Sequence, residues 1–112
     1  MNKTVVVITT TNTEKEALYI VNAILNERLA ACAQIFEIKS FYWWNGKVEN
    51  SSEYRIEFKT LSKFAKKIFE RIKNLHSYDV PEIVVIPVLK IEKNYLKWII
   101  KETSNDTKFQ KD

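Results

Sequence analysis

The feature that most constrains the fold is the dipeptide Asn45-Gly46, which stands between two long runs of strand-like residues. Gly46 is the only glycine in the chain. A type I′ turn needs positive φ at both central positions, and Asn-Gly adopts it more readily than other residue pairs. The sequence therefore predicts a long β-hairpin, with strands over 32–44 and 47–60.

Four consecutive aromatic residues, Phe41 to Trp44, stand directly before this turn. Successive side chains of a strand point to opposite faces, so this end of the hairpin is apolar on both faces. Because large aromatic side chains can bury about 150–250 Å² each, Tyr42, Trp43 and Trp44 form a candidate subunit interface. A stacking platform for single-stranded nucleic acid is the alternative, which the clustering of the aromatics at one turn makes the weaker interpretation.

Hydrophobic patterning predicts a strand over 4–10 and then a helix, whose first turn carries a capping box formed by Thr13 and Glu16. The apolar residues of strand 32–44 change parity along its length. We therefore expect a bend or bulge over 37–40.

The second half of the chain repeats the pattern. Ser62 is expected to cap a second helix with its side chain. The next strand, over 83–88, is apolar at every position, so we expect both of its faces to be covered. A last helix over 92–103 is expected to bury Tyr95, Trp98 and Ile99.

The predicted order is β-α-β-β-α-β followed by a terminal helix. This order is typical of the α+β ferredoxin-like sandwich, in which two helices cover one face of the sheet. The terminal helix and partner subunits would then cover the remaining surface of the sheet. We expect a single domain over 1–103 and a frayed polar tail over 104–112.

Composition limits the class of protein. The chain has 112 residues, of which 46% are hydrophobic, as expected for a globular domain. No apolar run approaches the ~20 residues that span a bilayer, and no secretory signal is visible. The lone cysteine, Cys32, excludes an intramolecular disulfide and indicates a reducing cytoplasm. A net charge of +4 is weak evidence for a polyanionic partner.

Few residues offer catalytic chemistry. One glycine excludes a dinucleotide fingerprint, and one histidine with one cysteine excludes a Cys/His zinc site within one chain. Cys32 lies in an apolar segment and is interpreted as a buried structural thiol. Glu49 and Glu53 would lie about 13 Å apart on a strand, too far for a carboxylate pair. We therefore assign no catalytic residue. We expect the protein to have no enzymatic activity and to require no cofactor.

His76 has two interpretations. It follows the second predicted helix, where a cation at the C-terminus is favoured by the helix dipole, so it can act as a structural cap. It can also be a metal ligand, because neutral imidazole is a common donor to copper and zinc. Tyr78, Asp79 and Glu82 could then add oxygen ligands.

Four segments together resemble a known family. They are Glu-Arg-Leu-Ala-Ala-Cys over 27–32, the hairpin over 40–53 with Lys-Thr at 59–60, His-Ser-Tyr-Asp-Val-Pro-Glu-Ile over 76–83, and Tyr-Leu-Lys-Trp-Ile over 95–99. On these segments the chain is similar to the CutA family of divalent-cation tolerance proteins. The resemblance covers nearly all of residues 4–103.

The resemblance implies a ferredoxin-like subunit in a tight homotrimer, similar in architecture to the PII signalling proteins. It also implies a role in tolerance or response to divalent metals, with binding of Cu(II) or another divalent cation, and no established enzymatic activity. The residues expected at the trimer interface are Tyr42, Trp43, Trp44, Glu53 and Tyr54.

The chain departs from the family pattern at three positions that bear on metal binding. Ser77 stands where the family commonly has proline, Thr9 where some members have cysteine, and Leu75 where some have a second histidine. Copper ligation therefore transfers only to His76.

Overall fold

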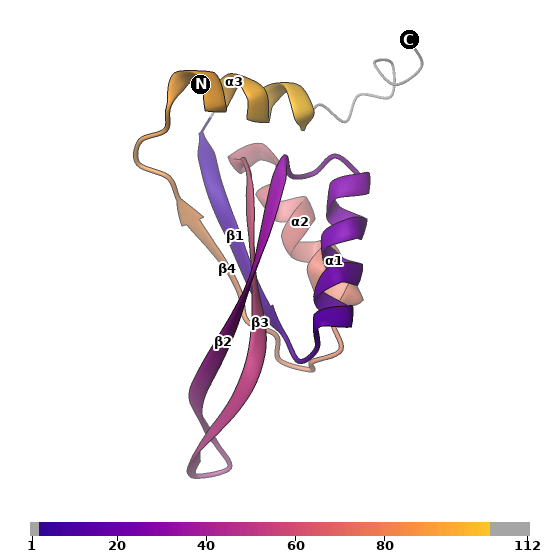
Figure 1. Ribbon diagram of the computed structural model, residues 1–112, viewed down its shortest axis with the longest axis vertical. Helices are drawn as coiled ribbons and strands as arrows, with labels where there is room; N and C mark the ends of the chain where they lie inside the picture. The colour runs from indigo at the N-terminus through magenta and orange to yellow at the C-terminus, as the bar shows by residue number, and fades with distance from the viewer. Residues whose placement is uncertain (1–2, 104–112) are drawn as a thin grey trace.

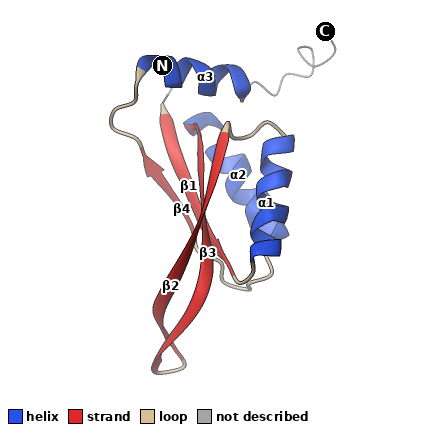
Figure 2. Cartoon of the chain, in the orientation of Figure 1, coloured by secondary structure: helices blue, strands red, loops and turns tan. Residues whose placement is uncertain are grey.

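The computed structural model describes residues 3–103, so the predicted polar tail over 104–112 lies outside the described residues. The order of elements follows the predicted β-α-β-β-α-β pattern with a terminal helix (Figures 1 and 2). The elements are β1 (Thr4–Thr11), α1 (Glu14–Asn26), β2 (Cys32–Trp44), β3 (Lys47–Leu61), α2 (Ser62–Leu75), β4 (Ile83–Pro87) and α3 (Lys93–Glu102).

The four strands form one antiparallel sheet in the order β2-β3-β1-β4. Helices α1 and α2 lie against one face of this sheet, and α3 crosses the end of the sheet that is remote from the hairpin turn (Figure 1). The core lies between the sheet and the two covering helices. Its largest fully buried side chains include Phe58, Ile20, Ile24, Ile56, Ile68 and Ile72.

Strand pairing decides which side chains face the helices. Val7 of β1 pairs with Phe58 of β3 and Val85 of β4, and this row lies on the helix side, since Val7 and Phe58 belong to the core. The next row, Ile8 and Val84, points to the opposite face. We call this opposite side of the sheet the open face.

The predicted hairpin is confirmed at its turn, where Asn45 has φ 52° and Gly46 has φ 78°. The bulge expected over 37–40 is wrong. The register of β2 with β3 is unbroken from Cys32, opposite Lys59, to the residues beside the turn. The apolar residues change parity because both faces of the hairpin end are apolar, so no extra residue is needed.

Helix capping was predicted correctly only in part. Thr13 caps α1, since its hydroxyl accepts a hydrogen bond from the backbone N–H of Glu16 at 3.1 Å. Ser62 does not cap α2. It is the first residue of that helix, and the capping position is taken by Leu61, which has no side-chain hydrogen bond to offer.

Two expectations of burial are also wrong for the single chain. Val84, Val85 and Ile86 are each about two-fifths exposed, because β4 is an edge strand. Tyr95 and Trp98 of α3 are similarly exposed, since this helix crosses the end of the sheet and does not lie on its face. Of the three side chains expected to be buried on α3, only Ile99 is buried.

Cys32 is the first residue of β2 and is partly exposed, so the expectation of a buried thiol is wrong. The segment before it crosses from α1 to the edge of the sheet, and Leu29 and Ala30 supply its buried side chains. None of the helices in the described part of the chain is long and apolar enough to cross a membrane.

Candidate functional site

The far half of the hairpin leaves the body of the protein. β1 pairs with β3 only as far as Tyr54, so residues 38–53 form a two-stranded ribbon with no third strand beside it (Figure 1). At about 3.4 Å per residue, the ribbon is about 20 Å long. Its outer part exposes large apolar side chains on both faces, namely Phe41, Tyr42, Trp43, Trp44 and Val48.

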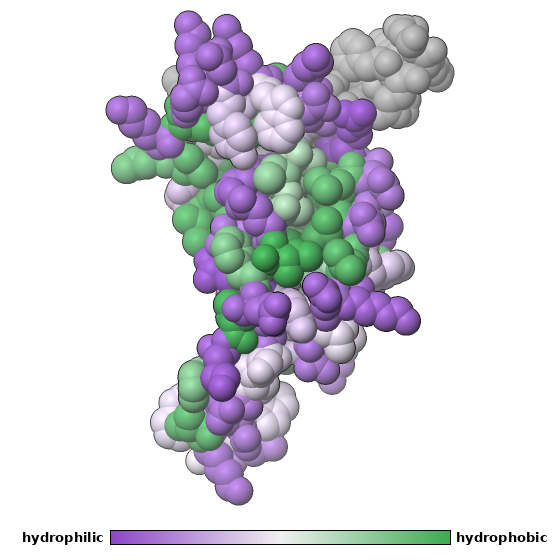
Figure 3. Space-filling view, in the orientation of Figure 1, coloured by the Kyte–Doolittle hydropathy of each residue, from purple (hydrophilic) through white to green (hydrophobic). Residues whose placement is uncertain are grey.

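Apolar side chains also reach the surface of the body (Figure 3). On the open face, Phe36 of β2 and Val84 and Ile86 of β4 are each 41–44% exposed. The β4 edge has no neighbouring strand within the described chain. Exposed apolar side chains thus lie both on the ribbon and on the open face of the sheet from which the ribbon extends.

The base of the ribbon is fixed by Glu53 and Tyr78. Glu53 is 9% exposed, and its Oε2 accepts a hydrogen bond from the Tyr78 hydroxyl at 2.8 Å. Burial raises the pKa of the Tyr78 hydroxyl, and the hydrogen bond and negative charge of Glu53 raise it further. The tyrosine is therefore held in its neutral, donating form, and the loop between α2 and β4 is tied to the ribbon.

His76 is the centre of the same loop. Its side chain is fully buried. Nε2 lies 2.7 Å from the carbonyl oxygen of Thr10, and Nδ1 lies 3.1 Å from the backbone nitrogen of Tyr78. A carbonyl can only accept and a backbone N–H can only donate, so the neutral imidazole with its proton on Nε2 satisfies both bonds.

Glu16 completes this network from α1. The backbone N–H and the hydroxyl of Ser77 donate to its two carboxylate oxygens at 2.8 and 2.9 Å. Its Oε2 lies 3.6 Å from Nδ1 of His76. Glu16 was predicted only as a capping residue, and no local sequence signal indicates its contact with a loop 61 residues away.

Two of the predicted oxygen ligands, Asp79 and Glu82, do not form a metal site with His76. Asp79 and Glu82 are exposed. Within residues 3–103, no group of three or more His, Cys, Asp or Glu side chains could hold a metal ion together. The nearest carboxylate to the imidazole is that of Glu16, which the sequence did not single out as a ligand.

The five residues expected at an interface fall into two groups. Tyr42, Trp43 and Trp44 are exposed on the ribbon. Glu53 is buried at the base of the ribbon, and Tyr54 is partly buried against the hydrophobic core. The first group is therefore exposed to solvent on the single chain, whereas the second group contacts other parts of its own chain.

Comparison with known proteins identifies the family. The family model described as CutA1 divalent ion tolerance protein matches residues 5–102. The divalent-cation tolerance protein CutA of Pyrococcus horikoshii is 43% identical over 99 residues, which are 88% of this chain and 97% of that protein. The corresponding protein of Thermus thermophilus is 39% identical over 99 residues, covering 88% and 96%. The chain belongs to the CutA1 family.

Solved structures agree with this assignment. The crystal structure of CutA1 from Pyrococcus horikoshii has a TM-score of 0.86 at 42% identity, and the match covers 89% of this chain and 98% of that one. A structure from Archaeoglobus fulgidus, described as a periplasmic divalent cation tolerance protein CutA, has a TM-score of 0.87 at 36% identity, covering 93% and 100%. The small α+β fold is therefore that of CutA1 structures.

The family resemblance predicted from the four sequence segments is confirmed. The relatives are named as tolerance proteins and not as enzymes. Their compartments differ, since a relative from Oryza sativa is named chloroplastic and the Archaeoglobus fulgidus structure is described as periplasmic.

Proposed function

We propose that this chain acts in divalent-cation tolerance as a homotrimer of ferredoxin-like subunits, either by weak metal binding or by PII-like signalling. The observation that carries the proposal is the exposed aromatic ribbon on a chain of the CutA1 family. The trimer itself is implied by the family resemblance. We place the protein in the cytoplasm because its one cysteine forms no disulfide.

The ribbon supports assembly for a physical reason. An isolated two-stranded hairpin is at best marginally stable in water, because too few of its side chains are buried. This ribbon also leaves Trp43 74% and Trp44 57% exposed. A neighbouring subunit would bury these side chains and stabilise the ribbon in its extended position.

The β4 edge supports the same proposal. Val84, Val85 and Ile86 form an apolar strand whose outer backbone groups have no partner strand among the described residues. Natural proteins protect such edges with charges, proline or a covering element, because exposed edges pair with other chains. We propose that a second subunit covers this edge, while Tyr42, Trp43 and Trp44 supply aromatic contacts and Glu53 and Tyr54 hold the ribbon in place.

For the metal, we propose that His76 binds Cu(II) or another divalent cation through Nδ1. This nitrogen presents its lone pair to the longer of the two ring hydrogen bonds, and Glu16 Oε2 lies 3.6 Å from it. An ion would have to displace the N–H of Tyr78 and enter a buried position. We therefore expect weak binding that requires the loop over 76–79 to open.

Calorimetric titration with Cu(II) tests the metal proposal. His76→Asn removes the imidazole nitrogen that would bind the metal and keeps a polar side chain. The control, Glu82→Gln, changes an exposed carboxylate in the same region. We expect the asparagine variant to lose the binding heat and the glutamine variant to keep it. Identical isotherms for wild type and His76→Asn would exclude this histidine as a ligand, provided that circular dichroism shows both to be folded.

The single-stranded nucleic-acid alternative gains no support from the relatives, whose names concern cation tolerance. It predicts binding to an oligonucleotide that weakens steeply as the salt concentration is raised, because such binding depends on contacts with phosphates. Fluorescence anisotropy with a labelled oligonucleotide at low salt measures it. A flat titration would remove this alternative, whereas salt-sensitive binding lost in Trp43→Ala would revive it.

A further inference from the structure

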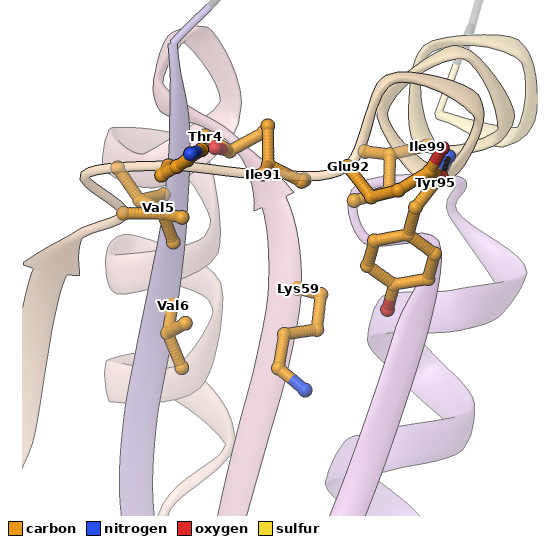
Figure 4. A pocket seen from close by; sticks show the side chains of 10 residues that line it. Thr4, Val5, Val6, Lys59, Ile91, Glu92, Tyr95 and Ile99 are labelled. Carbon is orange, nitrogen blue, oxygen red and sulfur yellow. Dashed lines mark hydrogen bonds between the residues drawn. The ribbon is translucent and has the colours of Figure 1, made fainter.

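The helix side of the molecule is the surface that the proposed trimer leaves uncovered. A cavity of about 280 Å³ between α3 and the end of the sheet (Figure 4) is lined in part by Val6 and Lys59, which pair on the open face. Helices α1 and α2 lie on the opposite face of the sheet, so their outer sides point away from the open face (Figure 1). These outer sides are therefore accessible in the single chain and in the proposed trimer alike.

The outer side of α2 is strongly basic. Its exposed lysines are spaced three, four or seven residues apart, which places them on one side of a helix. They are Lys63, Lys66, Lys67 and Lys73, and we call them the lysine face. Glu70 is the one acidic residue of α2, so the charge of this face is positive on balance.

The described part of the chain does not neutralise the lysine face. None of its four lysines forms an ion pair with a side chain of residues 3–103. On α1, Glu27 is paired with Arg71 at 2.7 Å, and both carboxylate oxygens of Glu16 bond to Ser77. Like charges three or four residues apart on a helix repel each other and destabilise it. An external anionic partner would relieve this repulsion.

The neighbouring helix α1 exposes apolar side chains on the same layer of the molecule. Leu18 is 48% exposed and Tyr19 is 60% exposed. Tyrosine is enriched where proteins meet the boundary between a membrane and water. An aliphatic side chain such as Leu18 has no ring on which a base could stack. Basic charge beside these two side chains therefore favours a membrane surface over nucleic acid.

We propose that the outer sides of α1 and α2 dock on the surface of a membrane that contains anionic phospholipid. Clusters of about four to eight basic residues on an amphipathic helix are typical of such binding, and each lysine near the surface strengthens it about fivefold. The apolar side of α2 is not available for insertion, because Phe64, Ile68 and Ile72 are buried in the core. The contact is therefore with lipid headgroups and depends on charge.

Co-sedimentation of the full chain, in its native assembly, with lipid vesicles tests the proposal. Phosphatidylcholine vesicles with about one-third phosphatidylglycerol supply the anionic surface, and pure phosphatidylcholine vesicles are the neutral control. We expect saturable binding to the anionic vesicles alone, and release at about 0.5 M salt, because salt screens exposed charges. Equal binding to both kinds of vesicle would overturn the proposal, and so would binding to neither.

A matched pair of double variants separates the lysine face from the overall charge. Lys63→Gln with Lys67→Gln removes two charges from α2, and Lys93→Gln with Lys97→Gln removes two charges at the same spacing from α3. We expect the α2 variant to bind anionic vesicles about twentyfold more weakly and the α3 variant to bind them as wild type does. Equal effects would overturn the proposal, because binding would then follow net charge alone.

Circular dichroism and light scattering show whether each variant is folded and assembled. If Lys63→Gln with Lys67→Gln is not, Lys66→Gln with Lys73→Gln makes the same charge change on the lysine face and replaces it in the test. A labelled oligonucleotide that binds wild type but not the α2 variant, without any vesicle binding, would overturn the proposal and assign the lysine face to nucleic acid.

Membrane docking depends neither on His76 nor on the trimer. The lysine face is exposed on the single chain and lies outside the surfaces that the proposed trimer covers. Loss of His76-dependent metal binding, or a native mass of one chain, would therefore leave the expected vesicle result unchanged. The proposed function and the membrane proposal fail independently.

Discussion

At the scale of single residues, the loop after α2 is held by side chains whose partners come from three other elements. His76 bonds to Thr10 of β1, Ser77 to Glu16 of α1, and Tyr78 to Glu53 of β3. Each bond joins segments that are remote in sequence. The loop is therefore a junction between the ribbon, the sheet and the first helix.

Tyr78→Phe tests this junction. The change removes only the hydroxyl and leaves the largely buried Glu53 carboxylate without its hydrogen-bond donor. Hydrogen bonds to charged groups contribute about 1.5–3 kcal/mol, so we expect the free energy of unfolding to fall by about that amount in a urea titration. Tyr42→Phe, which removes an exposed hydroxyl near Ser51, is the control and should cost less than 1 kcal/mol.

The same tyrosine predicts a pH dependence. Folding raises the pKa of Tyr78 above its ordinary value of about 10, so the neutral form stabilises the native state. This contribution is complete below pH ~10 and is lost as the pH rises from there toward the folded-state pKa. The stability advantage of wild type over Tyr78→Phe should therefore shrink above pH 10, and an advantage that stays constant up to pH 11.5 would contradict this account.

Thr9→Val is expected to stabilise the protein. Thr9 is fully buried on the helix side of β1, and its hydroxyl has no hydrogen-bond partner among the described residues. Valine has nearly the same shape and removes an unpaired polar group, so we expect a gain of about 1 kcal/mol in thermal or urea unfolding.

The matched control for Thr9→Val is Thr60→Val. Thr60 is equally buried, but its hydroxyl donates to the carbonyl of Leu29 at 2.6 Å. This change should destabilise the protein by about 1 kcal/mol or more. Equal effects of the two substitutions would contradict the hydrogen-bond assignment.

At the scale of elements, α1 is followed by a residue in the left-handed backbone conformation, where the chain turns away from the helix. Arg28 has φ 59°, and the N–H groups of Arg28 and Leu29 donate to the carbonyls of Leu25 and Ile24 in the pattern of a Schellman motif. The Arg28 side chain then reaches Glu102 of α3 at 2.9 Å. One residue thus ends the first helix and contacts the last one.

At the same scale of elements, substitutions in the hairpin turn test the assigned turn type. Gly46 has φ 78°, and a Cβ added there would meet no other atom within 4 Å. Any cost of Gly46→Ala therefore comes from the backbone, and a left-handed conformation costs an L-residue about 1–2 kcal/mol. We expect a loss of about 1 kcal/mol in unfolding free energy, whereas Asn45→Gly should cost little; the reverse ranking would contradict the type I′ assignment.

Sequence patterns predicted most of the elements because each depends on residues close together in the chain. The hairpin, the cap at Thr13 and the apolar faces of α1 and α2 are examples. The same patterns misplaced the burial of β4 and of Trp98, since an apolar run does not say which surface covers it. In the candidate site, His76 was visible as a lone imidazole, but its bonding to Thr10 joins residues 66 positions apart and has no local signature.

At the scale of the whole molecule, the chain is elongated, with extents of 52 × 30 × 21 Å, and the ribbon projects along its longest direction (Figure 1). Helices α1 and α2 cover one side of the sheet, and the ribbon and the β4 edge expose apolar side chains. The open face combines the apolar side chains of β2 and β4 with the charged side chains of β3, namely Arg55, Glu57 and Lys59. These three surfaces together are the basis of the proposed trimer.

The aromatic contacts of the trimer can be tested by Trp43→Ala combined with Trp44→Ala. Aromatic side chains buried at the centre of an interface can each contribute 2 kcal/mol or more to binding. Sedimentation velocity of the double variant should show dissociation at concentrations where wild type stays assembled. Lys39→Ala, on the ribbon but outside the aromatic group, is the control and should leave assembly unchanged.

The native mass of the chain, measured by light scattering across a dilution series, tests the central claim most directly. We expect a mass three times the 13.3 kDa of one chain, persisting to low micromolar concentration. A stable species of 13.3 kDa would contradict the account, because the ribbon and the open face would then be exposed to solvent in the working protein.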